Sequence, residues 1–178
     1  MKTQKPKTDI LRDIVHYHEN AMTYVRAVGA LSASFSQNSA SVAWRNYYDF
    51  YTIEINRHFE FEENIVFPAV RAGKGGDAYK DLLFLLCKQH GEIKRLGAEV
   101  LMFFTANKDH VVENALPVIH RSLLNFAGHL KRHAELENEK LLPVIEGDSR
   151  VRFLMGRAFI EQRVIYKQKF AMYQNTSI

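Results

Sequence analysis

The chain contains the stretch His58-Phe-Glu-Phe-Glu62-Glu-Asn-Ile-Val-Phe-Pro68, and it repeats this stretch as His133-Ala-Glu-Leu-Glu137-Asn-Glu-Lys-Leu-Leu-Pro143. Histidine, two glutamates and proline keep the same register in both copies. Residues four apart share one face of a helix, so each copy aims an imidazole and a carboxylate at the same point. Each copy therefore predicts half of a metal site, and the repetition argues against chance.

Each copy also has a histidine upstream, in a helical stretch of its own. His18 lies 40 residues before His58, and His90 lies 43 residues before His133. The sequence thus reads as a duplicated helical hairpin.

Apolar residues recur with helical rather than alternating spacing along most of the chain. Breaks such as Gly73-Lys-Gly-Gly76 separate the periodic stretches. We expect helices over residues 10–35, 41–70, 78–105 and 114–145, with a fifth that ends near residue 173. Short loops between long helices place neighbours antiparallel. The predicted fold class is all-α, an up-down-up-down four-helix bundle with an additional C-terminal helix.

This bundle would bring the four histidines to one level of an otherwise apolar core. Uncompensated imidazolium and carboxylate groups are costly there unless they are neutralised or coordinate a metal. Four imidazoles and two carboxylates exceed the needs of one tetrahedral zinc ion but suit two ions, with each carboxylate bridging both. Two divalent ions and two carboxylates leave a charge that an oxo or hydroxo bridge would reduce. The predicted metal ligands are His18, His58, Glu62, His90, His133 and Glu137.

Three further residues leave alternatives open. His16 replaces His18 as the ligand if the first helix is rotated about its axis. His129 precedes His133 by four residues, and Glu54 precedes His58 by four. These two are either additional ligands or outer groups that orient the imidazoles.

Composition limits the class of protein. The 178 residues suit one domain, or one domain with an extension. The single cysteine, Cys87, excludes a disulfide framework, fits a reducing compartment and is expected to be buried in an apolar run. No signal peptide or membrane span is recognisable, so we expect a cytoplasmic protein without membrane contact.

The formal charge of +4 belongs to the C-terminal end. Residues 1–146 hold equal numbers of basic and acidic side chains, so residues 147–178 carry the whole excess. We expect a metal-binding bundle over 1–146 and a basic amphipathic helix over 147–178. Such a pattern more often marks a solvated face than a nucleic-acid surface. Its apolar residues exceed one narrow stripe, so we also expect a homodimer with this helix near the interface.

The histidines, the two His-x3-Glu pairs and the prolines after them resemble the hemerythrin-like, His/His/Glu cation-binding family over about residues 10–146. The resemblance implies a four-helix bundle with a non-haem di-iron centre. Oxygen-carrying members have a further histidine on the third helix and a His-x4-Asp on the fourth. The set of four histidines and two glutamates is more similar to the branch that repairs iron–sulfur clusters.

Two functions follow as hypotheses. In the first, a dinuclear site binds or reacts with O2, NO or peroxide, in cluster repair or a stress response. In the second, the bundle is an oxygen, iron or redox sensor that signals through its C-terminal helix. Nitrogen and carboxylate ligands suit iron, manganese and zinc alike, and only the resemblance favours iron.

Overall fold

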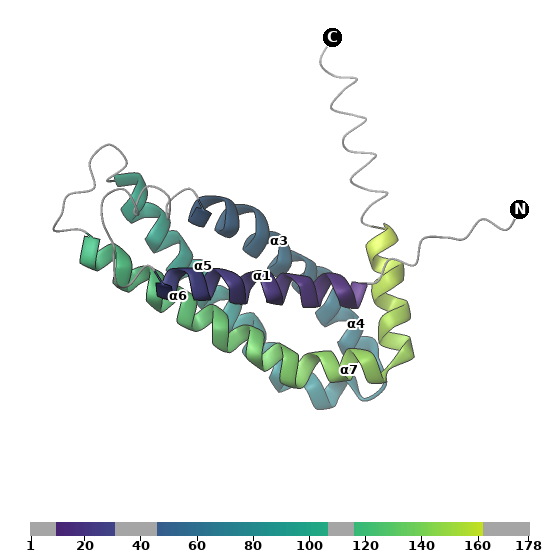
Figure 1. Cartoon of the computed structure of the whole chain (residues 1–178). Coiled ribbons are helices and arrows are strands. Elements are labelled where there is room, and N and C mark those ends of the chain that lie inside the picture. The colour runs from purple at the N-terminus through teal and green to yellow at the C-terminus, as the bar shows by residue number, and fades with distance from the viewer. Residues whose placement is uncertain (1–9, 31–45, 107–115, 162–178) are drawn as a thin grey trace, which may run out of the picture.

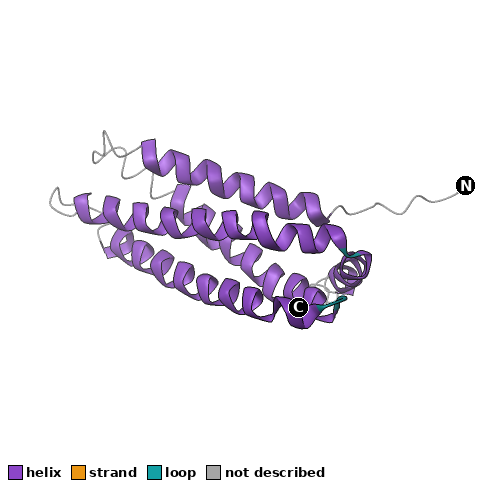
Figure 2. Cartoon of the chain, turned by 90° about the horizontal axis from the view of Figure 1, so that it is seen from below, coloured by secondary structure: helices purple, strands orange, loops and turns teal. Residues whose placement is uncertain are grey.

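The computed structural model describes residues 10–30, 46–106 and 116–161. These residues are almost entirely helical and contain no strand. Long helical stretches lie lengthwise beside one another, as Figures 1 and 2 show from two directions. The predicted all-α helical bundle is therefore confirmed.

The first and third stretches of the bundle are continuous helices, α1 (Ile10–Ala30) and α5 (Lys80–Ala106). The second stretch is composite. It runs through residues 46–49, η2 (Phe50–Ile55), α3 (Asn56–Phe61), η3 (Glu62–Val66) and α4 (Phe67–Ala72). The short η4 (Gly76–Tyr79) leads from it into α5. The fourth stretch joins α6 (Leu116–Leu136), η6 (Glu137–Leu141) and α7 (Leu142–Gly147).

Histidines occupy positions of the core-facing stripe in the continuous helices. In α1, the buried residues Ile14, His18 and Ala21 follow one another at spacings of four and three. In α5, Leu86, His90 and Ile93 repeat these spacings. A side chain at such a position faces the bundle interior whatever its chemistry. The helical period itself therefore places imidazoles in the core.

The helix widens at the glutamate of each repeat. The π-helical turns η3 and η6 begin at Glu62 and Glu137, and each glutamate carbonyl accepts a hydrogen bond from the backbone N–H five residues later. Pro68 and Pro143 follow, and a proline ring crowds the carbonyl four residues before it while offering no N–H. A wider turn accommodates that crowding, and single π turns are common at functional sites.

Two hydrophobic clusters fill the bundle on either side of the histidine level. One includes Ala21, Ile55, Ile93 and Leu130, together with the tyrosines of the second helical stretch. The other includes Ile14, Ile65, Leu86 and Leu141. Each histidine of the repeat therefore lies between apolar layers that exclude water.

A further helix over residues 149–161 packs across the end of the bundle near α4 and α7 (Figure 1). Its buried Val151 and Met155 join the second cluster. Asp148 accepts hydrogen bonds from the N–H groups of Arg150 and Val151, at 2.8 and 3.3 Å, and caps the helix. The Lys74 N–H donates to the same carboxylate at 2.8 Å, which fixes the loop before α5 to this helix.

Some predictions about the C-terminal tail are not tested by the described residues. Residues 162–178 lie outside the described part of the chain, and they include three of the six basic residues of the predicted tail helix, Arg163, Lys167 and Lys169. Phe153 and Ile160 are exposed. The division at residue 146 and the homodimer stay predictions.

The prediction that Cys87 is buried is wrong. Cys87 is exposed on α5, and so are Phe84 and Leu85 in the same apolar run. Because consecutive residues point in different directions around a helix, an unbroken apolar run must place some members on the outer face.

Candidate metal centre

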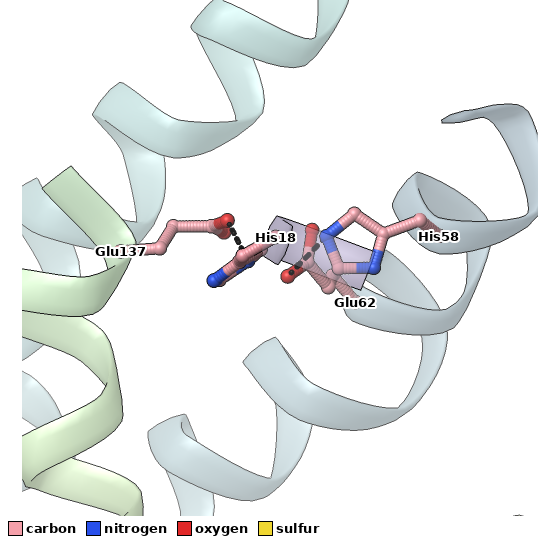
Figure 3. A group of neighbouring side chains, drawn as sticks. All are labelled: His18, His58, Glu62 and Glu137. Carbon is pink, nitrogen blue, oxygen red and sulfur yellow. Dashed lines mark ion pairs between the residues drawn. The ribbon is translucent and has the colours of Figure 1, made fainter. Parts of the chain in front are cut away.

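Six side chains from four helical stretches converge at the level between the two hydrophobic clusters. They form two groups of four whose potential ligand atoms all lie within 4.8 Å of one another: His18, His58, Glu62 and Glu137, and Glu62, His90, His133 and Glu137. Figure 3 shows the first group, in which the rings and carboxylates point toward a common centre. Both glutamates belong to both groups. The structure thus brings together all six residues that the sequence singled out.

The group is removed from solvent. Glu62 and Glu137 are 0% exposed, and the four histidines are between 1% and 4% exposed. Buried charges of this kind are normally paired or coordinate a metal. A buried set made only of imidazoles and carboxylates is therefore a strong candidate for cation binding.

Each carboxylate faces one histidine of each group. Glu62 directs Oε1 to His58 Nε2 at 3.2 Å and Oε2 to His90 Nε2 at 3.3 Å. Glu137 Oε2 lies 2.9 Å from His18 Nε2 and 3.2 Å from His133 Nε2. This is the placement that a carboxylate needs to bridge two ions.

These short distances do not amount to hydrogen bonding. The Nε2 atoms of His18 and His58 and all four glutamate oxygens are buried, and none has a hydrogen-bond partner within the described residues. The atoms instead point at shared positions between the side chains. Unpaired buried polar atoms are costly, so a cation at those positions would compensate a penalty already built into the fold.

Hydrogen bonds to side chains around the cluster orient three of the histidine rings. The Nδ1–H of His18 donates to Asn138 Oδ1 at 2.6 Å, that of His90 to Glu63 Oε1 at 2.8 Å, and that of His133 to Gln89 Oε1 at 3.0 Å. Because a carboxylate or amide oxygen only accepts, each of these rings carries its proton on Nδ1. Nε2 is then a free lone pair directed at the centre, as in metal-ligating histidines.

The pair His90 and His133 shows most directly whether the side chains of the cluster fit a metal ion. Their Nε2 atoms are 3.1 Å apart. With both rings protonated on Nδ1, two lone pairs face each other at that distance. Two acceptors cannot hydrogen-bond, whereas a cation between them satisfies both. The residues present therefore fit a metal ion.

Burial and neighbouring charges shift the histidine pKa values. Burial, reinforced by the other histidines, lowers the pKa of His58 to about 3. Burial and His133 lower the pKa of His90 to about 4, although hydrogen bonding to Glu63 opposes the shift. Burial also acts to lower the pKa of His18, but Glu137 outweighs it and the net shift is upward. His58 and His90 are thus neutral at physiological pH, as ligation requires.

The two glutamates shift in opposite directions. Burial and repulsion from Glu137 raise the pKa of Glu62 well above its usual range. Burial acts in the same direction on Glu137, but the surrounding histidines outweigh it and the pKa falls. Two carboxyl groups in one dry site cannot both ionise without added positive charge. A bound cation would let both do so.

The pKa of His58 predicts a pH dependence for the metal-free protein. The unfolded chain takes up a proton near pH 6.5 and the folded chain only near pH 3, so stability from this group falls as the pH drops through that window. The expected loss is up to about 1.4 kcal/mol per pH unit. Urea unfolding of wild type and His58→Gln between pH 7 and pH 5 measures it. The wild type should lose stability more steeply, and parallel curves would contradict the assignment.

The structure places the three residues that the sequence left as alternative ligands, His16, His129 and Glu54. His16 is exposed, and its Nε2 faces Asn20 Nδ2 at 3.4 Å. His129 faces Glu92 at 3.8 Å. Glu54 is half-buried. None of His16, His129 and Glu54 belongs to either potential ligand group among the described residues.

Sequence reasoning missed the outer acceptors Glu63, Asn138 and Gln89. A signal for two of them exists in the repeat, because Glu63 follows Glu62 and Asn138 follows Glu137. Each reaches the histidine of a neighbouring helix, His90 or His18. Glu63 also accepts from Lys94 Nζ at 3.1 Å, and its pKa is lowered because the two hydrogen bonds outweigh its partial burial.

Comparison with known proteins settles the family. The family model described as the hemerythrin HHE cation-binding domain matches residues 9–145. The chain belongs to this hemerythrin family. Comparison with curated proteins and with solved structures finds no match. Because the family domain is helical and binds cations, family membership indicates that the buried cluster is a cation-binding one.

The described hemerythrin-family helices do not include a membrane span. None of them is both long enough and apolar enough to cross a bilayer.

Proposed function

We propose that this protein holds two iron ions and reacts with O2, NO or peroxide, in iron–sulfur cluster repair or a related stress response in the cytoplasm. One ion would take His18 and His58, the other His90 and His133, and both glutamates would bridge. Bound iron would supply redox-active, Lewis-acidic positions for a small ligand. The family favours iron, although the donor set also suits manganese and zinc.

The observation that carries this proposal is the double placement of each glutamate. Glu62 lies between His58 and His90, and Glu137 lies between His18 and His133. A single ion would leave two imidazoles and part of each carboxylate unpaired in a dry core. Two ions engage all six side chains and leave coordination positions open.

The protein's own residues prepare the site before any ligand arrives. Asn138, Glu63 and Gln89 fix the rings of three histidines and their proton positions. Such outer partners fix ring orientation and increase ligand basicity. The hydrophobic clusters on both sides exclude water, which protects a reduced centre from uncontrolled oxidation.

A sensor remains the second candidate, and one contact favours it. The ring of Phe61, next to Glu62, packs edge-on against Phe159 of the C-terminal helix at 6.1 Å between centroids. A change in occupancy at Glu62 could therefore reach residues 149–161 through a direct side-chain contact. In this alternative the helix reports metal or oxygen occupancy to a partner.

One experiment separates the two candidates. Protein is loaded with ferrous iron under anaerobic conditions, and O2 or NO is then added while optical spectra are recorded. Rapid turnover of the added ligand supports the reactive centre. A stable adduct with altered proteolysis of the C-terminal helix supports the sensor. Fully loaded protein whose spectrum stays unchanged by O2, NO and peroxide would contradict both.

A further inference from the structure

The duplicated sequence relates the two candidate metal positions to each other. The first position has His18 and His58 (Figure 3), the second has His90 and His133, and both glutamates belong to each. The ligand types are therefore the same at both positions. The residues that surround the ligands are not the same, and the repeat shows which residue stands in place of which.

A phenylalanine packs most closely against the ligands of the second position. Phe59 follows the histidine of the first repeat, and Ala134 follows that of the second. The ring of Phe59 stacks on His90 with 3.9 Å between centroids and meets His133 edge-on at 5.3 Å. It lies farther from His58, at 6.0 Å. Ala134 has no ring to offer the first position, so only the second position gains stacking that favours one orientation of its imidazoles.

A glutamine orients a ligand of the second position, and a tyrosine replaces it at the first. Each precedes the upstream histidine of its repeat by one residue. Gln89 accepts a hydrogen bond from His133 Nδ1 at 3.0 Å, whereas Tyr17 packs its ring against His58 at 4.9 Å. His58 Nδ1 is buried and has no hydrogen-bond partner among the described residues. Within that part of the chain, no hydrogen bond fixes the tautomer of His58.

The third difference is one of charge. Glu63 accepts from His90 Nδ1 at 2.8 Å, and its counterpart Asn138 accepts from His18 Nδ1 at 2.6 Å. A carboxylate behind an imidazole increases the basicity of the ligand, and an amide lacks that charge. Glu63 also pairs with Lys94, but both side chains are 36% exposed and water screens that pair. All three differences therefore favour the second position.

We propose that the second position binds metal more tightly than the first, so that the centre fills in two steps and has a distinct half-loaded form. This inference rests on the proposed two-ion site and deepens it by giving an order of filling. In the half-loaded form, His90, His133 and both glutamates supply four ligands to one ion. That ion also separates the lone pairs of the two histidines, whose Nε2 atoms are 3.1 Å apart. The protein thus changes state at two metal concentrations.

Titration of metal-free protein with zinc tests the order of filling. Zinc is redox-inert and accepts four nitrogen and oxygen ligands, and a competing chelator brings both steps into range. NMR signals of the ring protons of His90 and His133 should shift during the first equivalent, and those of His18 and His58 during the second. The two dissociation constants should differ by at least roughly tenfold, the lower end of what outer partners contribute.

An exchange of the two outer side chains tests the cause. Repulsion between two cations weakens a second step at any site, so the variants decide whether the surroundings matter. Glu63→Gln should weaken the first step about tenfold, and Asn138→Asp should strengthen the second by a similar factor. Both substitutions keep an acceptor oxygen, and together they leave the net charge unchanged. In the double variant, the signals of His18 and His58 should shift within the first equivalent.

Tyr17→Gln tests the same cause by adding a partner in place of removing one. It gives His58 the amide that Gln89 gives His133, and should tighten the second zinc step about tenfold. Tyr17→Phe is the matched control, because it keeps a ring beside His58 and supplies no amide. Both of its zinc steps should equal those of the wild type.

The outcomes separate the order of filling from the proposed function. Wild type that binds a single zinc ion at saturation refutes the two-ion site itself. Two bound ions with the signals of His18 and His58 shifting first, or with all four histidines shifting in parallel, overturn the order alone. Dissociation constants unchanged by the exchange and by Tyr17→Gln would overturn its cause. Iron-loaded protein that fills in this order but reacts with neither O2, NO nor peroxide refutes only the reactive function.

Discussion

Glu62→Ala and Glu137→Ala are each expected to disturb both metal positions and not only one. The wild type should hold about two ions per chain, as in other two-metal sites. Each carboxylate faces a histidine of each group, so in the proposed bridging arrangement its removal would take one ligand from each ion. The loss of affinity should exceed the roughly 10- to 100-fold that removal of an outer-shell partner costs. Metal analysis and calorimetric titration of the purified variants measure it.

Substitutions of two histidines on α1 serve as controls for this experiment. His18→Ala should weaken mainly one ion, because His18 belongs to one group only. His16→Ala should leave the metal content unchanged, since His16 is exposed and outside both groups. Binding of a single ion by fully loaded wild type, or loss of only one ion from both glutamate variants, would contradict the bridging arrangement.

Removal of metal is expected to destabilise the protein strongly. Without a cation, two carboxyl groups that are 0% exposed and four buried imidazoles face one another in the core. With free metal at about 1,000 times its dissociation constant, binding to the folded state contributes about 4 kcal/mol. For a chain of this size, this corresponds to a melting temperature about 8 to 16 °C higher. Thermal melts with and without chelator measure the difference.

The double variant Glu62→Ala, Glu137→Ala serves as the control for chelation. It should melt at the same temperature with and without chelator, because it has lost both bridging ligands. Adding metal back to the wild type should restore its melting temperature. Equal melting temperatures for loaded and verified metal-free wild type would place the metal outside the core.

The helical period explains why so much of this protein is predictable from its sequence. His18 and His90 occupy core positions of their helices, and His58 and His133 each precede a glutamate by four residues. Spacings of three and four are local properties of an α-helix. They fix which side chains share a face before any tertiary contact exists. The all-α class, the helical bundle and the six-residue cluster all follow from these spacings and the repeat.

The helical period alone does not predict the exposure of Cys87 or the wide π-helical turns. An apolar run shows that a helix is partly buried, but only packing decides which of Leu83, Leu85 and Leu86 faces inward. Pro68 and Pro143 are visible in the sequence as the last residue of each repeat. That the backbone widens into π turns beginning at Glu62 and Glu137 is visible only when the helix is assembled around the site.

Sequence alone predicted the potential ligand atoms of the two His-x3-Glu pairs, because a histidine and a glutamate four residues apart share one face of any helix. Tertiary structure alone decided how the two halves of the site differ. His133 receives an amide oxygen from Gln89, whereas His58 packs against the ring of Tyr17 and borders a cavity. These contacts join residues 41 to 44 positions apart, and no local spacing encodes them. They arise from the distance and rotation at which the helices pack, which depend on the side chains of all four helical stretches together.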